Sequence, residues 1–126
     1  EGFQINGIID RVEVSPEGEY FIVDYKTGGK NKKIENIPDS LQLNLYCMAI
    51  KEKYGKLPKR ASFFYVEKPE GEQIFDYDVD PAKVDEVKQK LENYVKAIQN
   101  KEFKATPDEW TCRYCDYNDI CSESAK

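Results

Sequence analysis

The sequence lacks histidine, a long apolar run and an excess of positive charge. No apolar run approaches the roughly 20 residues that a helix needs to span a bilayer, so a membrane-spanning helix is excluded. The formal net charge of -5 argues against a protein that binds nucleic acid through bulk electrostatics. Without histidine, no imidazole ligand can come from these residues.

What is present suits a globular chain. The 126 residues are 40% hydrophobic and 34% charged, and this length is enough to bury the core of one domain. We therefore expect residues 1–126 to form a single domain. The chain begins at Glu1 rather than at methionine, and we expect it to be part of a longer one. From these residues we expect no secretory leader before the first apolar stretch.

Two apolar-polar alternations open the chain and predict a β-hairpin. The stretches 2–14 and 20–26 alternate, and SPEGE between them supplies turn residues. The first stretch does not keep a strict period of two, which predicts a bulge near Gly7.

The rest of the chain predicts two helices and two further strands. A helix runs from Asp39 or Ser40 to Gly55, with the cap residues expected at its ends. Strands are predicted over 60–68 and 71–80, and a second helix over 81–103. Residues 104–126 have no periodicity and form a cysteine-rich C-terminal segment.

An acid and a lysine lie two residues apart on the second strand. Asp24 and Lys26 share a face because strand side chains repeat every two residues, and the hairpin brings Asp10 close to Asp24. Crowded carboxylates repel unless a cation relieves them, and Mg²⁺ is usually held by one or two carboxylates. A lysine beside such a site can orient a water or offset charge on a phosphate oxygen. The pattern favours phosphodiester cleavage, with surface salt bridges as the alternative.

The first predicted helix carries polar groups inside an apolar surface. Gln42 and Tyr46 share one helix face. Buried polar groups need partners, and a substrate backbone or the edge of a metal site could provide them. The alternative is an ordinary helix in which Gln42 bonds to local backbone. Cys47, on another face, is expected to be a core residue.

The stretches GIIDRVE, VDYKTG and QLNLY, in this order, resemble the RecB-like branch of the PD-(D/E)xK nuclease superfamily. That branch includes the nuclease domains of AddB-type and RecB-type helicase-nucleases and the CRISPR-associated RecB-like exonucleases. The resemblance implies an α/β fold with a restriction-endonuclease-like core, in which helices flank a mixed central β-sheet. It also implies a Mg²⁺- or Mn²⁺-dependent DNA nuclease, an exonuclease rather than an endonuclease, that acts in DNA repair or recombination. DNA is then the expected partner, and a helicase domain or subunit a second one.

The resemblance assigns roles by position. Asp10 and Asp24 match the two metal-binding acids, Lys26 matches the catalytic lysine, and the backbone carbonyl of Tyr25 is a further metal ligand. RecB-like nucleases carry a histidine on a helix upstream of the first acid, and we expect that helix to lie upstream of Glu1. A DNA-binding or assembly module that keeps the fold without catalysis is the alternative function. DNA binding or support of the site is implied for Thr27, Lys30, Lys32, Lys33, Gln42 and Tyr46.

Three cysteines lie close together near the C-terminus. Cys112, Cys115 and Cys121 form a C-x2-C-x5-C run, whose short loops can return three thiolates to one metal. Metal ligation points to a reducing interior, hence to a cytoplasmic protein. In the resembling families, such cysteines join an upstream cysteine around a [4Fe-4S] cluster. Zinc is the alternative metal, a strained Cys112–Cys115 disulfide a further reading, and a small zinc-ribbon interaction protein the third function considered.

Overall fold

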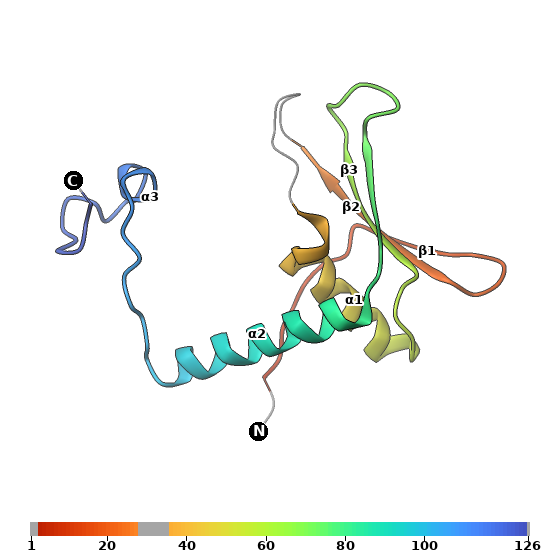
Figure 1. Ribbon diagram of the computed structural model, residues 1–126, viewed down its shortest axis with the longest axis horizontal. Coiled ribbons are helices and arrows are strands. Elements are labelled where there is room, and N and C mark those ends of the chain that lie inside the picture. The colour runs from red at the N-terminus through yellow and green to blue at the C-terminus, as the bar shows by residue number, and fades with distance from the viewer. Residues whose placement is uncertain (1–2, 28–35, 126) are drawn as a thin grey trace. The chain divides into compact units, whose positions relative to one another are not determined.

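The computed structural model describes residues 3–27 and 36–125 (Figure 1). Lys30, Lys32 and Lys33, which were predicted to contact DNA, lie outside the described residues. Within the described ranges, no helix combines the length and the apolar character that crossing a membrane requires.

The predicted hairpin is confirmed. Strand β1 (Arg11–Val14) pairs antiparallel with β2 (Tyr20–Lys26), and Arg11 lies opposite Val23. Gly18 closes the turn with φ 77°, a left-handed conformation that glycine adopts without strain, and its N–H donates to the Ser15 carbonyl at 2.8 Å. This register places Asp10, one residue before β1, next to Asp24.

The first strand is shorter than predicted, and the expected bulge near Gly7 is wrong. Residues 3–9 are outside the sheet, which begins only at Arg11. Gly7 lies beside Tyr46, because a Cβ built on it would be 3.7 Å from the Tyr46 ring. The alternation breaks in this segment because it is not paired in the sheet: Ile5 and Ile8 are exposed, and only Ile9 packs against the core.

The sheet has four strands in the order β1-β2-β3-β4. Strand β3 (Arg60–Tyr65) runs parallel to β2, and β4 (Ile74–Asp78) runs antiparallel to β3. A parallel pair needs a crossover connection, which the first helix supplies. The predicted α/β fold with a mixed central sheet and flanking helices is confirmed.

Helix α1 (Leu41–Tyr54) follows the short 3-10 helix η1 (Ile37–Asp39) and covers one face of the sheet. Ser40 caps its first turn by accepting the Leu43 N–H at 3.3 Å, and Gly55 ends it with φ 81°. Cys47 is a core residue as predicted, and its burial raises the pKa of the thiol to about 12. The largest fully buried side chains of this core are Ile22, Leu43, Asn44, Cys47, Phe63 and Tyr65.

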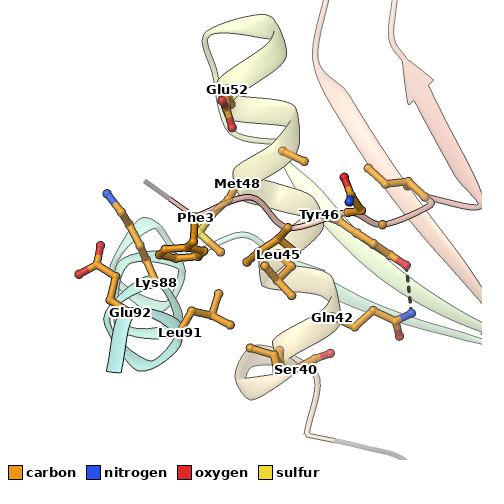
Figure 2. Close-up of a pocket in the computed structure, with 16 residues that line it drawn as sticks. Phe3, Ser40, Gln42, Leu45, Tyr46, Met48, Glu52, Lys88, Leu91 and Glu92 are labelled. Carbon is orange, nitrogen blue, oxygen red and sulfur yellow. Dashed lines mark hydrogen bonds between the residues drawn. The ribbon is translucent and has the colours of Figure 1, made fainter. Parts of the chain in front are cut away.

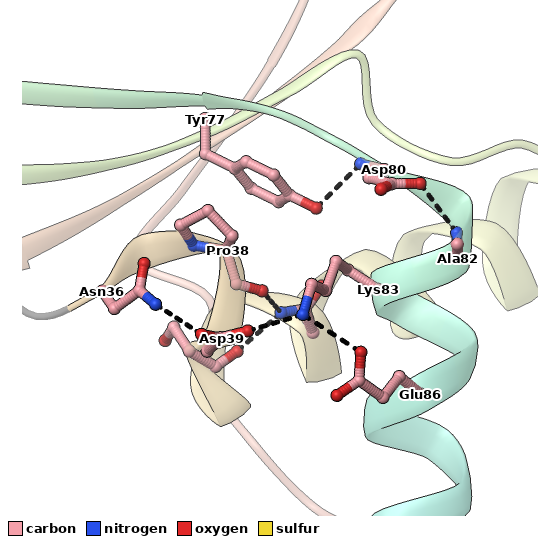
Figure 3. A network of polar contacts seen from close by, with 10 residues as sticks. Asn36, Pro38, Asp39, Tyr77, Asp80, Ala82, Lys83 and Glu86 are labelled. Carbon is pink, nitrogen blue, oxygen red and sulfur yellow. Dashed lines mark hydrogen bonds and ion pairs between the residues drawn. The ribbon is translucent and has the colours of Figure 1, made fainter.

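Helix α2 (Pro81–Gln99) ends four residues earlier than predicted. Its first turn is fixed by Asp80, whose side chain accepts the Ala82 N–H at 2.9 Å, and by Lys83. Lys83 forms ion pairs with Asp39 of η1 at 2.9 Å and with Glu86 at 3.1 Å (Figure 3). The neighbouring carboxylates raise the pKa of Lys83. These contacts tie the start of α2 to the segment that leads into α1.

The chain divides into two compact units, Glu1–Asn93 and Tyr94–Lys126. The second unit contains a short helix, α3 (Glu109–Arg113), that the sequence reading missed. Asp108 caps it by accepting the Thr111 N–H at 2.9 Å, and hydrogen bonding from the Thr111 side chain, together with this backbone bond, lowers the pKa of Asp108. A helix of five residues is too short to show a 3.6-residue period, so the cap was its only signal. The single-domain organisation stays a prediction.

Candidate active site

Asp24 and Lys26 form a close ion pair on the covered face of β2. Asp24 is only 3% exposed, and its Oδ2 lies 2.9 Å from the Lys26 Nζ. This contact makes an ion pair but no aligned hydrogen bond, so the Asp24 Oδ2 is buried without a hydrogen-bond partner among the described residues. Burying a carboxylate oxygen without a hydrogen bond costs free energy of folding, and such atoms are rare in native proteins. The position of Asp24 therefore points to a role other than stability.

Lys26 is held from three sides. Its ammonium donates to the Gln42 Oε1 at 2.5 Å, pairs with Asp24, and lies 4.8 Å from the ring centre of Phe63. The ammonium is therefore fixed beside the buried carboxylate. The Gln42 side chain bonds to the side chains of Lys26 and Tyr46, whereas the alternative prediction had it bond to local backbone. Its place at the edge of a metal site stays a prediction.

Phe63 belongs to this arrangement although the sequence reading did not place it there. It lies opposite Asp24 in the parallel pairing of β2 with β3 and is fully buried. Its ring face attracts the Lys26 ammonium through a cation-π contact. Only the register of two strands far apart in the sequence brings these residues together, so the local sequence carried no signal for it.

Gln42 also connects Lys26 to Tyr46. The Gln42 Nε2 donates to the Tyr46 hydroxyl at 3.1 Å, as the dashed line in Figure 2 shows. Both side chains line a groove of about 870 Å³ between residues 3–9, α1 and the middle of α2. Apolar side chains, among them Phe3, Leu45 and Leu91, make up most of its wall. The polar chain from Asp24 to Tyr46 thus ends at an open groove.

Asp10 reaches the site from the position that directly precedes β1. Its Oδ2 accepts the backbone N–H of Tyr25 at 2.9 Å, which fixes the carboxylate next to the middle of the D-x-K element. Unlike Asp24, Asp10 is exposed. On the opposite face of the sheet, the Tyr25 hydroxyl accepts from Arg11 at 3.1 Å, and this bond raises the pKa of Arg11. Exposed Thr27 follows the end of β2.

The sequence matches the family model of the PD-(D/E)XK nuclease superfamily over residues 1–122. The chain belongs to this superfamily. No curated protein matches the sequence. The matched residues include the Asp10–Tyr46 region, which contains the candidate site described above. They also include the cysteine run Cys112, Cys115 and Cys121.

PD-(D/E)XK nucleases are metal-dependent enzymes that use divalent cations and act on DNA. The residues of this site fit such a cation in donor type. Mg²⁺ and Mn²⁺ take oxygen ligands. The buried Asp24 Oδ2 is such an oxygen, and it has no hydrogen-bond partner among the described residues, which is the state expected of an atom that binds a cation. In Asp10, the Oδ2 accepts the Tyr25 N–H, which leaves the Oδ1 of the same carboxylate as the oxygen that can bind a cation.

The C-terminal cysteines are arranged differently from a metal site. Within residues 3–27 and 36–125, no three side chains among His, Cys, Asp and Glu gather closely enough to hold a metal ion. Cys112, Cys115 and Cys121 are free thiols, and the Cys112 Sγ accepts the Ala125 N–H at 3.4 Å. This placement does not fit a cluster, and no disulfide joins Cys112 to Cys115.

Proposed function

We propose that this chain is a RecB-like DNA exonuclease domain whose active site is built on Asp10, Asp24 and Lys26. The buried Asp24 carboxylate, which pairs with Lys26 and whose Oδ2 has no hydrogen-bond partner among the described residues, carries the proposal. Membership of the PD-(D/E)XK nuclease superfamily supports it. The role in DNA repair or recombination, and a helicase domain or subunit as partner, come from the sequence resemblance.

Asp10, Asp24 and the backbone carbonyl of Tyr25 are the proposed ligands of Mg²⁺ or Mn²⁺. When bound, such a cation lowers the pKa of a water and screens the charge of a phosphate. Asp24 would bind the cation from a position that is only 3% exposed to solvent, where electrostatic interactions are stronger than in water.

Lys26 is the proposed water-orienting residue. Its Nζ lies within 2.9 Å of Asp24, so a water or phosphate oxygen near that carboxylate also lies near the ammonium. A fixed ammonium stabilises negative charge as it develops on a phosphate oxygen, at no cost of reorganisation. Gln42 and Phe63 keep this ammonium in place.

The remaining site residues are proposed DNA contacts. Gln42 and Tyr46 lie between Lys26 and the groove, and Thr27 leaves β2 on the side of the site. Lys30, Lys32 and Lys33 follow Thr27 closely in the sequence and would supply positive charge to a chain whose net charge is -5.

The metal assignment is tested by titrating Mn²⁺ into the protein by calorimetry. We expect wild type to bind, and Asp24→Asn to lose most of the binding while keeping the shape of the side chain. Asp78→Asn is the matched control, because Asp78 is an exposed β4 carboxylate that pairs with Arg60 away from the site. Equal binding in wild type and Asp24→Asn would contradict the assignment.

Nuclease activity is tested with labelled linear and circular single-stranded DNA in Mn²⁺. An exonuclease degrades the linear strand and leaves the circle intact. Binding of both strands without cleavage of either would favour the alternative, a catalytically inactive DNA-binding or assembly module. Cleavage of the circle would assign an endonuclease.

Cys112, Cys115 and Cys121 stay a proposed ligand set for a [4Fe-4S] cluster, with zinc as the alternative metal. The support is their spacing, since the thiols as placed do not fit a cluster. Metal analysis of protein purified without oxygen distinguishes iron from zinc.

A further inference from the structure

A cluster of positive charge lies at the C-terminal end of α1. Residues 51–60 contain four lysines, one arginine and one glutamate, which gives this segment a net charge of +4 in a chain whose net charge is -5. Lysines in the last turn of a helix complement the helix dipole, and this explains Lys51 and Lys53. The dipole does not explain Lys56 and Lys59, which come after the helix has ended.

Two tyrosine rings hold the lysines together. The rings of Tyr20, the first residue of β2, and Tyr54, the last residue of α1, stack with their centres 4.7 Å apart. The Lys56 Nζ lies 5.6 Å from the centre of the Tyr20 ring, and the Lys53 Nζ lies 5.4 Å from the centre of the Tyr54 ring. Each ring attracts its ammonium, and the Lys59 N–H donates to the Tyr20 carbonyl at 2.8 Å. We call Lys53, Lys56 and Lys59 the lysine patch.

Ion pairs neutralise little of the charge of the lysine patch. Within residues 3–27 and 36–125, Lys53 and Lys59 form no ion pair. Lys56 pairs with Glu19 at 3.7 Å, but both side chains are more than 40% exposed, and surface pairs of this kind contribute little. The patch therefore offers ammonium groups to a partner that carries negative charges at short intervals, as a nucleic-acid strand does.

The lysine patch lies about 20 Å from Lys26, along the strand that carries the candidate site. Tyr20, Asp24 and Lys26 share one face of β2, and the six steps from Tyr20 to Lys26 cover about 20 Å. Helix α1 gives the same separation. Its Gln42 bonds to Lys26 and its Tyr54 stacks on Tyr20, and the twelve steps between them cover about 18 Å along the helix.

We propose that the lysine patch binds the phosphate backbone of the same DNA strand that is cut at Lys26, about 20 Å from the reacting phosphate. The inference rests on the proposed function, which puts a phosphate beside Lys26. Phosphates of one strand are about 3.4 Å apart along a duplex, so the patch meets the strand about six phosphates from the site. Once one of the two places holds the strand, binding at the other is intramolecular, and the strand is released more slowly.

The first test measures how the binding of a single strand depends on salt, by fluorescence anisotropy in EDTA so that no cleavage occurs. Lys53→Gln/Lys56→Gln removes both ammonium groups that lie over the rings. For a strand of about 16 nucleotides, we expect the affinity to fall about tenfold or more at about 50 mM salt. The slope of log K against log salt should decrease by about 1.4, because each contact to a single-stranded phosphate contributes about 0.7. Strands of different base sequence should lose affinity alike, because phosphates carry no sequence information.

Lys90→Gln/Lys96→Gln is the matched control, because it removes the same charge from two exposed lysines of α2. We expect this variant to bind within about twofold of wild type and with the same salt slope. Circular dichroism during thermal unfolding checks that both double variants are folded. An unchanged slope in Lys53→Gln/Lys56→Gln would overturn the proposal, and an acidic protein surface would then be the partner that the patch fits.

Strand length tests whether one strand reaches both places. A strand of about 4 nucleotides spans about 10 Å at the duplex spacing, so Lys26 and the patch cannot hold it together. In Lys53→Gln/Lys56→Gln, we expect this short strand to lose less than about threefold in affinity, while the strand of about 16 nucleotides loses about tenfold or more. An equal loss at both lengths would show that the patch binds the strand by itself, and would contradict an arrangement with two contacts on one strand.

These binding measurements are independent of nuclease activity. If the lysine variant shows the expected slope but the protein cuts neither linear nor circular DNA, the proposed function alone is contradicted. If the protein cuts DNA and the slope is unchanged in Lys53→Gln/Lys56→Gln, this inference alone is contradicted.

Discussion

At the scale of single residues, the Asp24–Lys26 pair is the feature that most separates this site from an ordinary sheet edge. Salt bridges at a surface contribute little, but both partners here are largely covered, with side chains 5% and 19% exposed. Removing one partner of such a pair leaves an uncompensated charge in a poorly solvated place. The pair should therefore matter for stability as well as for function.

Lys26→Met should lower the free energy of unfolding by about 3 kcal/mol, because Asp24 then loses its cation. Urea denaturation followed by circular dichroism measures the change. The control is Lys56→Met, which breaks a 3.7 Å pair with Glu19 between side chains 44% and 42% exposed and should change stability by less than about 1 kcal/mol. Equal effects of the two variants would show that the Asp24–Lys26 pair is in effect a surface pair.

Cys47 gives a pH dependence with a definite sign. Burial raises the pKa of its thiol from 9.0 to about 12, so the folded state keeps the proton that the unfolded state loses above pH 9. The stability that Cys47 contributes is fully present below pH 9 and is lost as the pH rises toward 12. We expect the stability difference between wild type and Cys47→Ala to shrink from pH 8 to pH 10.5 in denaturant titrations. A constant difference would mean that the thiol ionises alike in both states.

At the scale of elements, α1 links the fold to the site. Its inner face, with Leu43 and Cys47, fills the core, while Gln42 and Tyr46 in its first two turns reach Lys26 and the groove. The start of the helix must therefore be well formed for the polar chain to exist. Ser40 secures that start through its bond to the Leu43 N–H.

Ser40→Ala should cost about 1 kcal/mol, because a helix N–H loses its cap. Native-state hydrogen exchange should show faster exchange in the first turn of α1, with little change near Tyr54. Asp108→Ala is the counterpart in the second unit, since it removes the cap of α3 and should speed exchange there only. Unchanged exchange at Leu43 in Ser40→Ala would show that Ser40 does not stabilise the helix start.

At the scale of the whole molecule, the two proposed metal sites fall in different units. Asp10, Asp24 and Lys26 belong to Glu1–Asn93, and Cys112, Cys115 and Cys121 belong to Tyr94–Lys126. The four-stranded sheet and α1 lie wholly in the first unit. Binding of Mn²⁺ at the carboxylates should therefore not depend on the cysteines.

Replacing Cys112, Cys115 and Cys121 together by serine should leave the Mn²⁺ affinity within about twofold of wild type, while iron or zinc in the purified protein is lost. Calorimetry and metal analysis of the same preparations give both quantities. Asp24→Asn is the converse variant, which should lose Mn²⁺ and keep the other metal. A parallel loss of both metals in either variant would contradict the independence of the two sites.

Much of this arrangement followed from local patterns in the sequence. The period of two gave the hairpin and the shared face of Asp24 and Lys26, the cap residues gave both ends of α1, and Gln42 and Tyr46 were recognised as polar groups on one helix face. The period failed before Arg11, where the chain is not paired in the sheet, and in α3, which is too short to have a period.

The sequence by itself determined which groups are the candidates for the chemistry, since two acids, a lysine and a Gln-Tyr pair are a matter of residue type and short spacing. Only the tertiary structure decided how these groups meet. The parallel register of β2 with β3 placed Phe63 beside Lys26, and the packing of α1 on the sheet turned Gln42 toward the ammonium. Both depend on contacts between segments far apart in the chain, whose pairing is set by burial of the whole core rather than by any local pattern.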